Sequence, residues 1–264
     1  MPELAEVEYF RKRWDAGLGE KIVGVLLHGE KRIFRGADVR AIERRLVRQT
    51  LLRSRARGKQ MRFEFSGDNW LGIHLGMSGN LRIERARFQA GKHDHFVLQQ
   101  KERALVFADA RQFGRVRFHH GKAAPDWWEA TGTEIHSSEF SKTLLREFVR
   151  RHARAPIKAV LLLQEGFPGV GNWMADEILW RARIAPRTRA GKLSEERLAA
   201  VWRTTRFVAR TALETIGGNF SDPPGNWLLH VRWKSGGRCP RDGTTLRRAT
   251  IGGRTTAWCI RCQR

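Results

Sequence analysis

Hydrophobic and polar positions follow two different periods along the first half of the chain. Over residues 4–16, Val7, Phe10 and Trp14 recur at spacings of three and four, which predicts a helix. Over residues 21–119, apolar and polar residues alternate in short segments separated by glycine, asparagine and charged turns, which predicts strands. The clearest of these segments are KIVGVLLHG, QMRFEFSG, WLGIHLGMSGNLRIE, HFVLQQKERALVFAD and GRVRFHH. So many short strands predict a β-sandwich or a flattened barrel.

The second half of the chain changes to a helical period after a stretch of linker composition at 121–134. The expected helices are 141–152, 157–164, 174–184 and 194–216, and one more, 38–45, interrupts the strands. We expect Ser194 to cap the longest helix and Gly217-Gly218 to end it. Residues 228–233 (LLHVRW) suggest a further strand before a C-terminal hairpin. These patterns predict an α+β multi-domain fold, divided into 1–122, a linker at 123–134, 135–226 and 227–264.

The charge balance changes the picture of what this fold binds. Fifty Lys and Arg residues against 27 Asp and Glu residues give a net charge of +23. One interpretation is simply an arginine-rich surface; the other is a polyanionic partner, because cationic faces gain affinity by releasing counterions from phosphates. The basic residues are spread along the whole chain, which favours a folded nucleic-acid-binding surface over a basic tail.

Targeting signals are the next feature that the sequence bears on. No apolar run approaches the ~18–20 residues that a membrane span needs. The first residues, MPELAE, contain no basic segment followed by an apolar one, as a secretory signal would. We therefore expect an intracellular protein with no membrane association.

The last residues contain a pattern of metal-ligating side chains. A four-cysteine finger of this type would read C-x2-C-x16-C-x2-C. At these four positions the chain has Cys239, Asp242, Cys259 and Cys262, and the three cysteines are the only ones in the sequence. Carboxylate oxygen is an accepted zinc ligand, so we expect one structural zinc ion with Asp242 in place of a cysteine. A metal-free hairpin and a Cys259–Cys262 redox pair are the alternatives, and His230 is a spare candidate ligand.

The N-terminus carries a possible nucleophile. If Met1 is removed, Pro2 becomes a free secondary amine, which can attack an aldehyde-type carbon and form an iminium. Glu3 and Glu6 are three residues apart, so we expect them on one face of the first helix, where a carboxylate can serve as general acid and base. Read alone, the same residues are an ordinary helix start with acidic side chains at its positive end.

Five segments in one order decide between these interpretations. PELAEVE at the start, HLGMSGNLR at 74–82, DARQFGR at 109–115, GVGNWMADEILWRARIAP at 169–186 and GGRTTAWCIRCQ at 252–263 together resemble the formamidopyrimidine-DNA glycosylase / endonuclease VIII family of DNA repair enzymes. The resemblance extends over essentially the whole chain. It implies an N-terminal helix with a β-sandwich, a helix–two-turn–helix domain that binds DNA, and a C-terminal zinc β-hairpin.

The resemblance implies a bifunctional DNA glycosylase and lyase of base-excision repair. Pro2 would attack C1′ of a damaged nucleotide, expel the base and leave a Schiff base, and β- and δ-elimination would then cut the strand. Glu3 matches the family's general acid and base, and Glu6 matches its second carboxylate near the sugar. Lys59, in RGKQMRFEF, falls where the family has a lysine that contacts the phosphate and assists catalysis.

The remaining matches concern DNA binding. Met77, Arg111 and Phe113 match the family's set of residues that fill the gap left when a base leaves the stack. An ordinary core role for Met77 and Phe113 is the alternative. Asn172 matches the family's phosphate-gripping asparagine and Arg254 its finger arginine, which is expected to clamp phosphates without reading sequence. We expect the neighbouring acids Asp176 and Glu177 to stabilise a helix start.

The expected partner is damaged double-stranded DNA, bound by a monomer without a small-molecule cofactor in the bacterial cytoplasm, at the nucleoid. Only a short segment, 217–226, precedes Trp227, where relatives that grip 8-oxoguanine usually carry a longer capping loop; preference for that base is therefore in doubt. Oxidised pyrimidines, formamidopyrimidines, hydantoins and abasic sites stay open, because Met77, Arg111 and Phe113 match the formamidopyrimidine branch better than the endonuclease VIII branch. Two other functions stay open. One is an inactive lesion-binding protein of the same fold, although Pro2, Glu3 and Lys59 are all present; the other is a zinc-ribbon accessory factor.

Overall fold

The computed structural model describes residues 1–264 and divides into two compact units. Unit 1 comprises Met1–Pro2 and Glu6–Ala130, and unit 2 comprises Glu3–Ala5 and Thr131–Arg264. The first helix, α1, therefore begins in unit 2 and continues in unit 1. The boundaries expected from sequence at 122, 134 and 226 stay predictions. None of the helices is long and apolar enough to cross a membrane.

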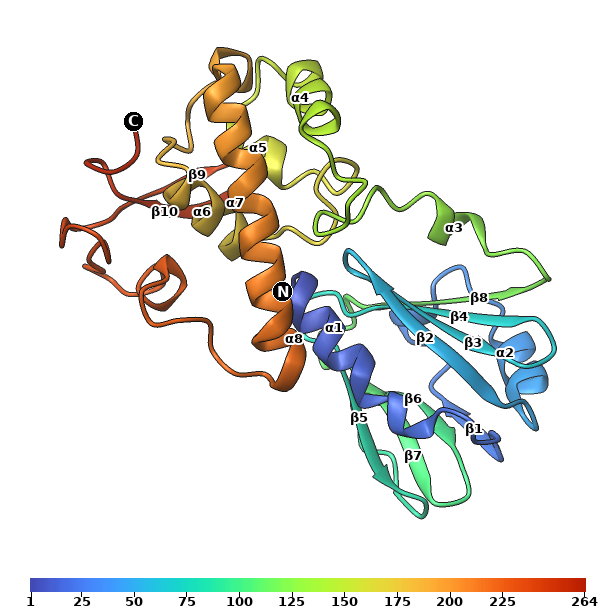
Figure 1. Ribbon diagram of the computed structural model, residues 1–264. Helices are drawn as coiled ribbons and strands as arrows, with labels where there is room; N and C mark the ends of the chain where they lie inside the picture. The colour runs from blue at the N-terminus through green and yellow to red at the C-terminus, as the bar shows by residue number, and fades with distance from the viewer. The chain divides into compact units, whose positions relative to one another are not determined.

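Unit 1 is a sandwich of two antiparallel four-stranded sheets, as expected (Figure 1). One sheet has the strand order β1-β6-β7-β5 and the other the order β2-β3-β4-β8. The strands are β1 (Gly24–Leu27), β2 (Leu51–Arg57), β3 (Gln60–Phe65), β4 (Asn69–His74), β5 (Asn80–Arg85), β6 (Asp94–Gln99), β7 (Arg103–Ala108) and β8 (Arg115–His120). The helices are α1 (Leu4–Arg13), α2 (Val39–Leu46) and α3 (Asp126–Glu129), with 3-10 turns at Asp15–Gly17 and Arg32–Phe34.

Alternation along the strands builds the core between the sheets. On β3, Met61, Phe63 and Phe65 are buried, and the residues between them are only half-buried. Trp14 fills the space at the end of α1, with its ring centroid 4.8 Å from that of Phe63. Burial of these large side chains is the main favourable term in the folding of unit 1.

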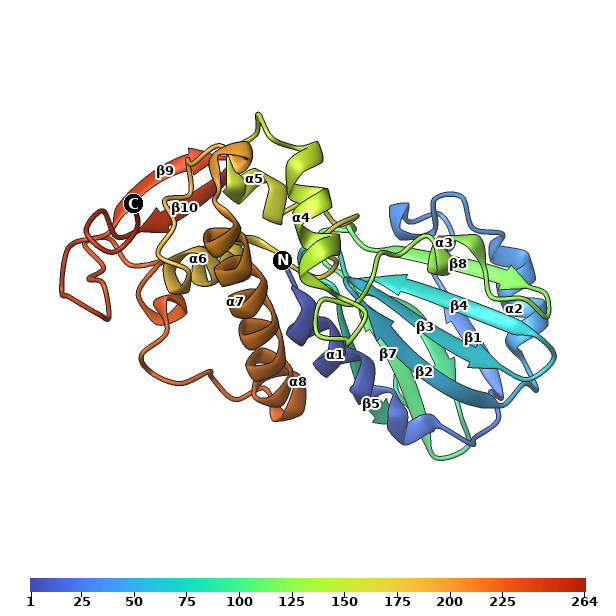
Figure 2. The same ribbon diagram turned by 45° about the horizontal axis from the view of Figure 1, so that its top comes forward.

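Unit 2 contains a helical bundle and a two-stranded hairpin, as expected (Figure 2). Its main core collects side chains of the four longer helices, among them Phe148, Val160, Ile178 and Val208. The elements are α4 (Lys142–Arg151), α5 (Ile157–Leu161), α6 (Asn172–Arg181), α7 (Glu195–Glu214), α8 (Ile216–Asn219), β9 (Arg247–Ile251) and β10 (Arg254–Trp258), with 3-10 turns at Ala190–Lys192 and Leu228–His230. Ser194 caps α7, accepting a hydrogen bond from the backbone N–H of Arg197 at 3.3 Å, which confirms that prediction.

Two local predictions about unit 2 are wrong. Residues 228–233 form no strand: Leu228–His230 is a 3-10 turn, and Arg232 lies at 2% exposure, where its guanidinium pairs with a buried carboxylate. Gly217 and Gly218 do not end the helical region either. The helix α7 ends at Glu214, and the short helix α8 then includes both glycines and ends at Asn219, followed by Phe220 with a left-handed φ of 65°.

The hairpin closes through a two-residue turn. Ile251 pairs with Arg254, and the glycines between them, Gly252 and Gly253, have φ values of 60° and 70°. Two successive positive φ values are typical of the type I′ turns that suit antiparallel strands, and glycine adopts them without steric cost. A side chain at Gly252 would lie 3.0 Å from the Cα of Ala159, so the tip of the hairpin packs closely on α5.

Candidate functional site

The carboxylate of Glu3 occupies the N-terminus of α6. Its two oxygens accept hydrogen bonds from the backbone N–H groups of Gly171 (2.8 Å), Trp173 (2.9 Å) and Met174 (3.1 Å), and the residue is 3% exposed. Gly171 supplies no side-chain cap to the helix, so Glu3 satisfies donors that would otherwise be orphaned. A side chain on Gly171 would lie 2.3 Å from the Glu3 carboxyl carbon, so only glycine admits this approach.

The surroundings of Glu3 differ from those expected. Glu3 precedes the first helical residue, Leu4, and its carboxylate is turned to α6, so the expectation that Glu3 and Glu6 share one face of a helix is wrong. Glu6 lies inside α1 and is half-buried. Pro2, also half-buried, directly precedes Glu3 in the chain. A fixed, buried carboxylate therefore stands one residue from the candidate nucleophile.

Asn172 and the strand of Arg254 are brought together within unit 2. The side-chain amide of Asn172 donates a hydrogen bond to the carbonyl of Thr255 at 2.8 Å. The buried ammonium of Lys158 donates to the carbonyl of Asn172 at 2.7 Å. Arg254, adjacent to Thr255, is exposed at the start of β10. Two candidate phosphate ligands thus lie on elements that are joined by a direct hydrogen bond.

A buried ionic cluster around Asp176 makes the same connection more firmly. Asp176 is fully buried and accepts hydrogen bonds from Lys158 Nζ at 2.5 Å, Arg232 Nε at 3.0 Å and the backbone N–H of Ala257 at 3.1 Å. Burial lowers the pKa of Lys158, and the facing Asp176 charge opposes that shift. The cluster ties α5, α6 and β10 together, so the expectation that Asp176 merely stabilises a helix start is wrong.

Glu177 has a different set of contacts from its neighbour. It is also fully buried; its carboxylate accepts hydrogen bonds from Arg181 Nε at 2.7 Å and from the backbone N–H of Leu229 at 3.2 Å. Burial raises the pKa of Glu177, and Arg181 opposes that shift. Glu177 therefore fastens the segment after α8 to α6. The isolated Lys158 in the apolar stretch IKAVLLL is a sequence signal for the Asp176 cluster, because a buried lysine needs a counter-charge.

Lys59 lies in unit 1 in a strongly positive environment. It is half-buried and follows Gly58, whose φ of 59° forms the turn between β2 and β3. Burial, followed by the charges of Lys59, Arg117 and Arg35, lowers the pKa of His74 to about 4. His74 is consequently neutral near pH 7, with Nδ1 accepting a hydrogen bond from the backbone N–H of Gly76 at 3.0 Å. Clustered cations of this kind suit a phosphate.

The three residues expected to fill a gap in DNA lie on two loops of unit 1. Met77 is 37% exposed and Phe113 is 38% exposed, so a core role for either is wrong. Arg111 is exposed as well, with its guanidinium carbon 4.8 Å from the centroid of the Phe113 ring. Exposed apolar side chains beside an arginine are the composition that a wedge into stacked bases requires.

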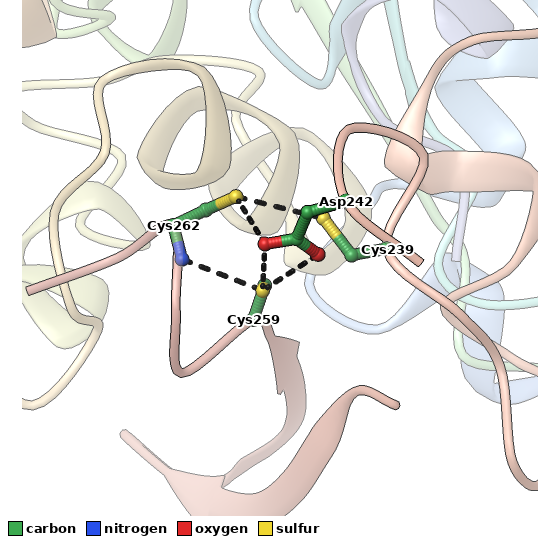
Figure 3. A group of neighbouring side chains, drawn as sticks. All are labelled: Cys239, Asp242, Cys259 and Cys262. Atoms are coloured by element: carbon green, nitrogen blue, oxygen red, sulfur yellow. Dashed lines mark hydrogen bonds between the residues drawn. The ribbon is translucent and has the colours of Figure 1, made fainter. Parts of the chain in front are cut away.

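The three cysteines and Asp242 converge at the base of the hairpin (Figure 3). Their candidate ligand atoms all lie within 4.8 Å of one another. Cys239 Sγ is 3.7 Å from Cys262 Sγ, and Cys259 Sγ is 3.5 Å from Asp242 Oδ2. A tetrahedral zinc ion with bonds of about 2.3 Å to sulfur and about 2.1 Å to oxygen separates its ligand atoms by roughly 3.6–3.8 Å. The four groups could therefore hold a metal ion.

Hydrogen bonds around the sulfurs support the same interpretation. The indole N–H of Trp180 donates to Cys239 Sγ at 3.3 Å, and the backbone N–H of Cys262 donates to Cys259 Sγ at 3.4 Å. Burial, followed by the neighbouring Asp242 carboxylate, raises the pKa of the Cys262 thiol to about 12, so this thiol needs a nearby cation to ionise near pH 7. His230 is not among the converging groups, and its Nε2 lies 3.0 Å from the carbonyl of Pro223.

Comparisons with known proteins agree with this arrangement. The family model described as the formamidopyrimidine-DNA glycosylase N-terminal domain matches residues 1–116, and the model of the H2TH domain of the same enzymes matches residues 131–223. The formamidopyrimidine-DNA glycosylase of Xanthomonas axonopodis pv. citri is 35% identical, with both chains covered completely. That of Carboxydothermus hydrogenoformans is 31% identical, again over all of both chains.

Solved structures show the same similarity in three dimensions. The Lactococcus lactis glycosylase in complex with DNA containing an oxidised pyrimidine has a TM-score of 0.90 and 28% identity, with 99% of each chain covered. The same glycosylase in complex with DNA containing FAPY-dG has a TM-score of 0.89, also at 28% identity over 99% of each chain.

Proposed function

The chain belongs to the formamidopyrimidine-DNA glycosylase family of DNA repair, and from this membership we propose that it is a bifunctional glycosylase and lyase that removes oxidised bases from duplex DNA. The observation that carries the proposal is Glu3, a buried carboxylate fixed by three backbone amides immediately after Pro2. The joint presence of Pro2, Glu3 and Lys59 favours an enzyme over an inactive DNA-binding protein of the same fold, and a zinc-ribbon accessory factor would not explain the N-terminus.

In the proposed mechanism Pro2, freed of Met1, supplies the nucleophile. Its amine nitrogen forms a bond to C1′ while the bond from C1′ to the damaged base breaks, and the base leaves with the bonding electron pair and takes up a proton. Glu3 donates and accepts the protons that this exchange requires. The bonded nitrogen then loses its proton, the C1′–O4′ bond of the sugar ring breaks, and O4′ takes up a proton. This ring opening leaves the nitrogen and C1′ joined as an iminium, the Schiff base.

Strand cleavage follows from the same iminium. It acidifies the C2′ hydrogen, and loss of that proton expels the 3′ phosphate; a second elimination expels the 5′ phosphate. Glu6 and Lys59 are the proposed helpers, Glu6 as a second carboxylate near the sugar and Lys59 as a phosphate ligand in the positive surroundings that lower the pKa of His74. Asn172 and Arg254 would hold phosphates from unit 2.

The proposed lesion class follows from the segment between α8 and Trp227. Only Phe220–Asn226 connects them, and Pro223 and Pro224 stiffen it, so it lacks the length to fold over a base. We propose oxidised pyrimidines, formamidopyrimidines and abasic sites as substrates in preference to 8-oxoguanine. The Lactococcus lactis relative has been crystallised with DNA of the first two kinds.

The proposed metal is one structural zinc ion held by Cys239, Asp242, Cys259 and Cys262. Zinc would fix the base of the hairpin whose opposite end presents Arg254. Elemental analysis of the purified protein tests this: about one zinc per chain is expected, and the Asp242→Ala variant should hold less. Asp222→Asn, which neutralises an exposed aspartate elsewhere in unit 2, serves as the control. A metal-free wild-type protein would contradict the zinc site and leave the hairpin held by its packing and its hydrogen bonds to α6.

A cleavage panel tests the activity. Duplexes carrying an oxidised pyrimidine, a formamidopyrimidine, 8-oxoguanine or an abasic site are incubated with the purified protein, and products are resolved by length and end group. We expect the duplexes with an oxidised pyrimidine, a formamidopyrimidine or an abasic site to be cleaved, leaving phosphate at both ends of the gap. Binding to all four duplexes without cleavage would instead support the lesion-binding alternative.

A further inference from the structure

The two loops that carry Met77, Arg111 and Phe113 cross between the sheets side by side. Residues 75–79 lead from β4 in one sheet to β5 in the other, and residues 109–114 lead from β7 back to β8. Because β4 pairs with β8 and β5 pairs with β7, both crossings lie at the same end of the sandwich. The topology thus sets the loops next to each other, but it does not by itself fix their tips.

A side-chain hydrogen bond joins the two loops. Ser78, on the first loop, donates its hydroxyl to Asp109 Oδ1 on the second at 2.6 Å. The same hydroxyl oxygen accepts from the backbone N–H of Arg111 at 3.3 Å. Ser78 is next to Met77 in the chain, so this one hydroxyl links the residue beside Met77 to Arg111 itself.

Asp109 is the fixed point of this link. It is fully buried, and its second oxygen accepts a hydrogen bond from the backbone N–H of Gly114 at 2.6 Å, which closes the second loop around Phe113. Its backbone is held as well: its N–H donates to the carbonyl of His93 at 3.0 Å, and its carbonyl lies 3.1 Å from Nε2 of His95. A buried carboxylate bonded in this way has one available orientation.

The loops also touch through their backbones. Gly76 has a φ of 61°, and a side chain there would lie 2.3 Å from the backbone carbonyl carbon of Phe113. A side chain on Gly114 would lie 2.8 Å from Asp109 Oδ2. Glycine is required at position 76 because the second loop leaves no room for a side chain there, and at position 114 because Asp109 of the same loop lies too close. The hydrogen bond from Ser78 to Asp109 therefore joins segments that are already packed at van der Waals distance.

We infer that Ser78 and Asp109 are positioning residues that lock the two loops into one preformed wedge. The inference rests on the proposed function, since it concerns how the enzyme would open duplex DNA. If the three side chains are held in the arrangement that DNA binding requires, less conformational entropy is lost when the base leaves the stack. Without the link, Met77 and the Arg111–Phe113 pair would enter the DNA as two independent loops.

The variants that test the lock are Ser78→Ala, Ser78→Thr and Asp109→Asn. Ser78→Ala removes the hydroxyl and leaves the Gly114 contact of Asp109 intact, whereas Ser78→Thr keeps the hydroxyl. Asp109→Asn keeps the shape of the side chain but replaces one of its two acceptor oxygens with an NH2 group, which donates. Ser138→Ala, at an exposed serine in unit 2, is the matched control. Circular dichroism and thermal unfolding establish that each variant is folded before its activity is compared.

Two substrates separate positioning from chemistry. Excision of an oxidised pyrimidine from a duplex needs the wedge, whereas cleavage of an abasic site in single-stranded DNA needs no base to leave a stack. We expect Ser78→Ala to slow the duplex reaction about 10-fold, as loss of a hydrogen bond to a charged group predicts, with the single-stranded reaction changed less than 2-fold. Ser78→Thr should stay within about 3-fold of wild type, and Asp109→Asn should lose at least as much as Ser78→Ala.

A binding measurement keeps this inference distinct from the proposed chemistry. A 2-aminopurine placed beside the lesion brightens when stacking is broken, whether or not the strand is cut. Ser78→Ala should reduce that rise, and an enzyme that brightened the probe but never cleaved would overturn the proposed function alone. Equal losses on the two substrates, or a Ser78→Ala variant with wild-type duplex excision and fluorescence, would overturn the inference.

Discussion

Asp176 and Arg232 are 56 residues apart in the chain, yet they form an ion pair with side chains only 0% and 2% exposed. Arg232 comes from the segment before the hairpin and Asp176 from α6, and Lys158 completes the cluster. A buried ion pair is weak evidence for stability, but the loss of one partner is strongly destabilising because the other charges remain buried. The ionic cluster therefore fastens the hairpin to the helical bundle, and substitution of any one of its charged residues is expected to destabilise unit 2.

Asp176→Ala should accordingly destabilise unit 2. It leaves Lys158 and Arg232 buried without their counter-charge, at a cost of about 3–5 kcal/mol, which corresponds to a fall in Tm of roughly 10 °C for a unit of this size. Thermal unfolding measures the fall, and hydrogen exchange at the Ala257 amide reports whether β10 has come loose. The exposed Asp222→Asn variant should unfold as wild type does. A Tm within 1 °C of wild type for Asp176→Ala would show that the cluster does not hold the hairpin.

Glu3→Gln should separate binding from chemistry. A glutamine can accept from the α6 amides through only one oxygen, and it cannot exchange a proton, so we expect the excision rate to fall about 100-fold or more. Affinity for duplex containing an uncleavable abasic analogue should change less than 10-fold. Single-turnover kinetics and fluorescence anisotropy measure the two quantities, with Glu196→Gln on the exposed start of α7 as control. Wild-type excision by Glu3→Gln would remove Glu3 from the mechanism.

His74 should make unit 1 less stable in mild acid. Its pKa is lowered to about 4 in the folded protein and lies near 6.5 in an unfolded chain, so between these values the unfolded state binds more protons. Stability attributable to His74 is complete above about pH 6.5 and declines as the pH falls towards 4, by up to about 1.4 kcal/mol per pH unit.

Denaturant titrations between pH 4 and pH 7 measure this effect as a difference between variants. His74→Asn should show a shallower loss of stability on acidification than wild type, because asparagine does not titrate. His120→Asn, at an exposed histidine, should keep the wild-type slope. Parallel curves for wild type and His74→Asn would show that the folded-state pKa of His74 is not depressed.

Arg254→Ala should reveal a phosphate contact through its salt dependence. A residue that neutralises one phosphate contributes about one counterion to the binding equilibrium, so the slope of log K against log salt should become shallower by about 1. The loss of affinity should be similar for all lesions, because a phosphate contact carries no base information. Arg40→Ala on α2 removes the same charge from unit 1 and should leave the slope unchanged; an unchanged slope for Arg254→Ala would contradict a phosphate contact.

Sequence periodicity was sufficient where neighbouring residues decide the structure. The alternation on β3 and the cap at Ser194 are both local signals, and the structure has a strand and a helix start at these places. The sequence analysis did not predict the strand β2. Its residues, LLRSRAR, have arginines at alternate positions and only a weak alternation of apolar and polar side chains.

The features that sequence did not predict depend on distant partners. LLHVRW has the composition of a strand, but the fold turns Arg232 inward because Asp176 lies beside it. In the helix expected at 174–184, Asp176 would be a first-turn acid; in the structure α6 begins at Asn172, and Asp176 is buried by tertiary contacts beyond the first turn. The role of Glu3 as the cap of α6 likewise joins residues about 170 positions apart, with Gly171 leaving room for it. Motif resemblance pointed to Glu3 but not to how it is held.

The most direct test of the central claim is the site of covalent attachment to DNA. The protein is mixed with duplex containing an abasic site, reduced with borohydride and digested, and the modified peptide is sequenced by mass spectrometry. We predict a single adduct on the amine of Pro2 in protein that has lost Met1, and no adduct in protein with an uncleaved N-terminal extension. An adduct on Lys59 or any other lysine, or trapping that survives the extension, would contradict Pro2 as the nucleophile.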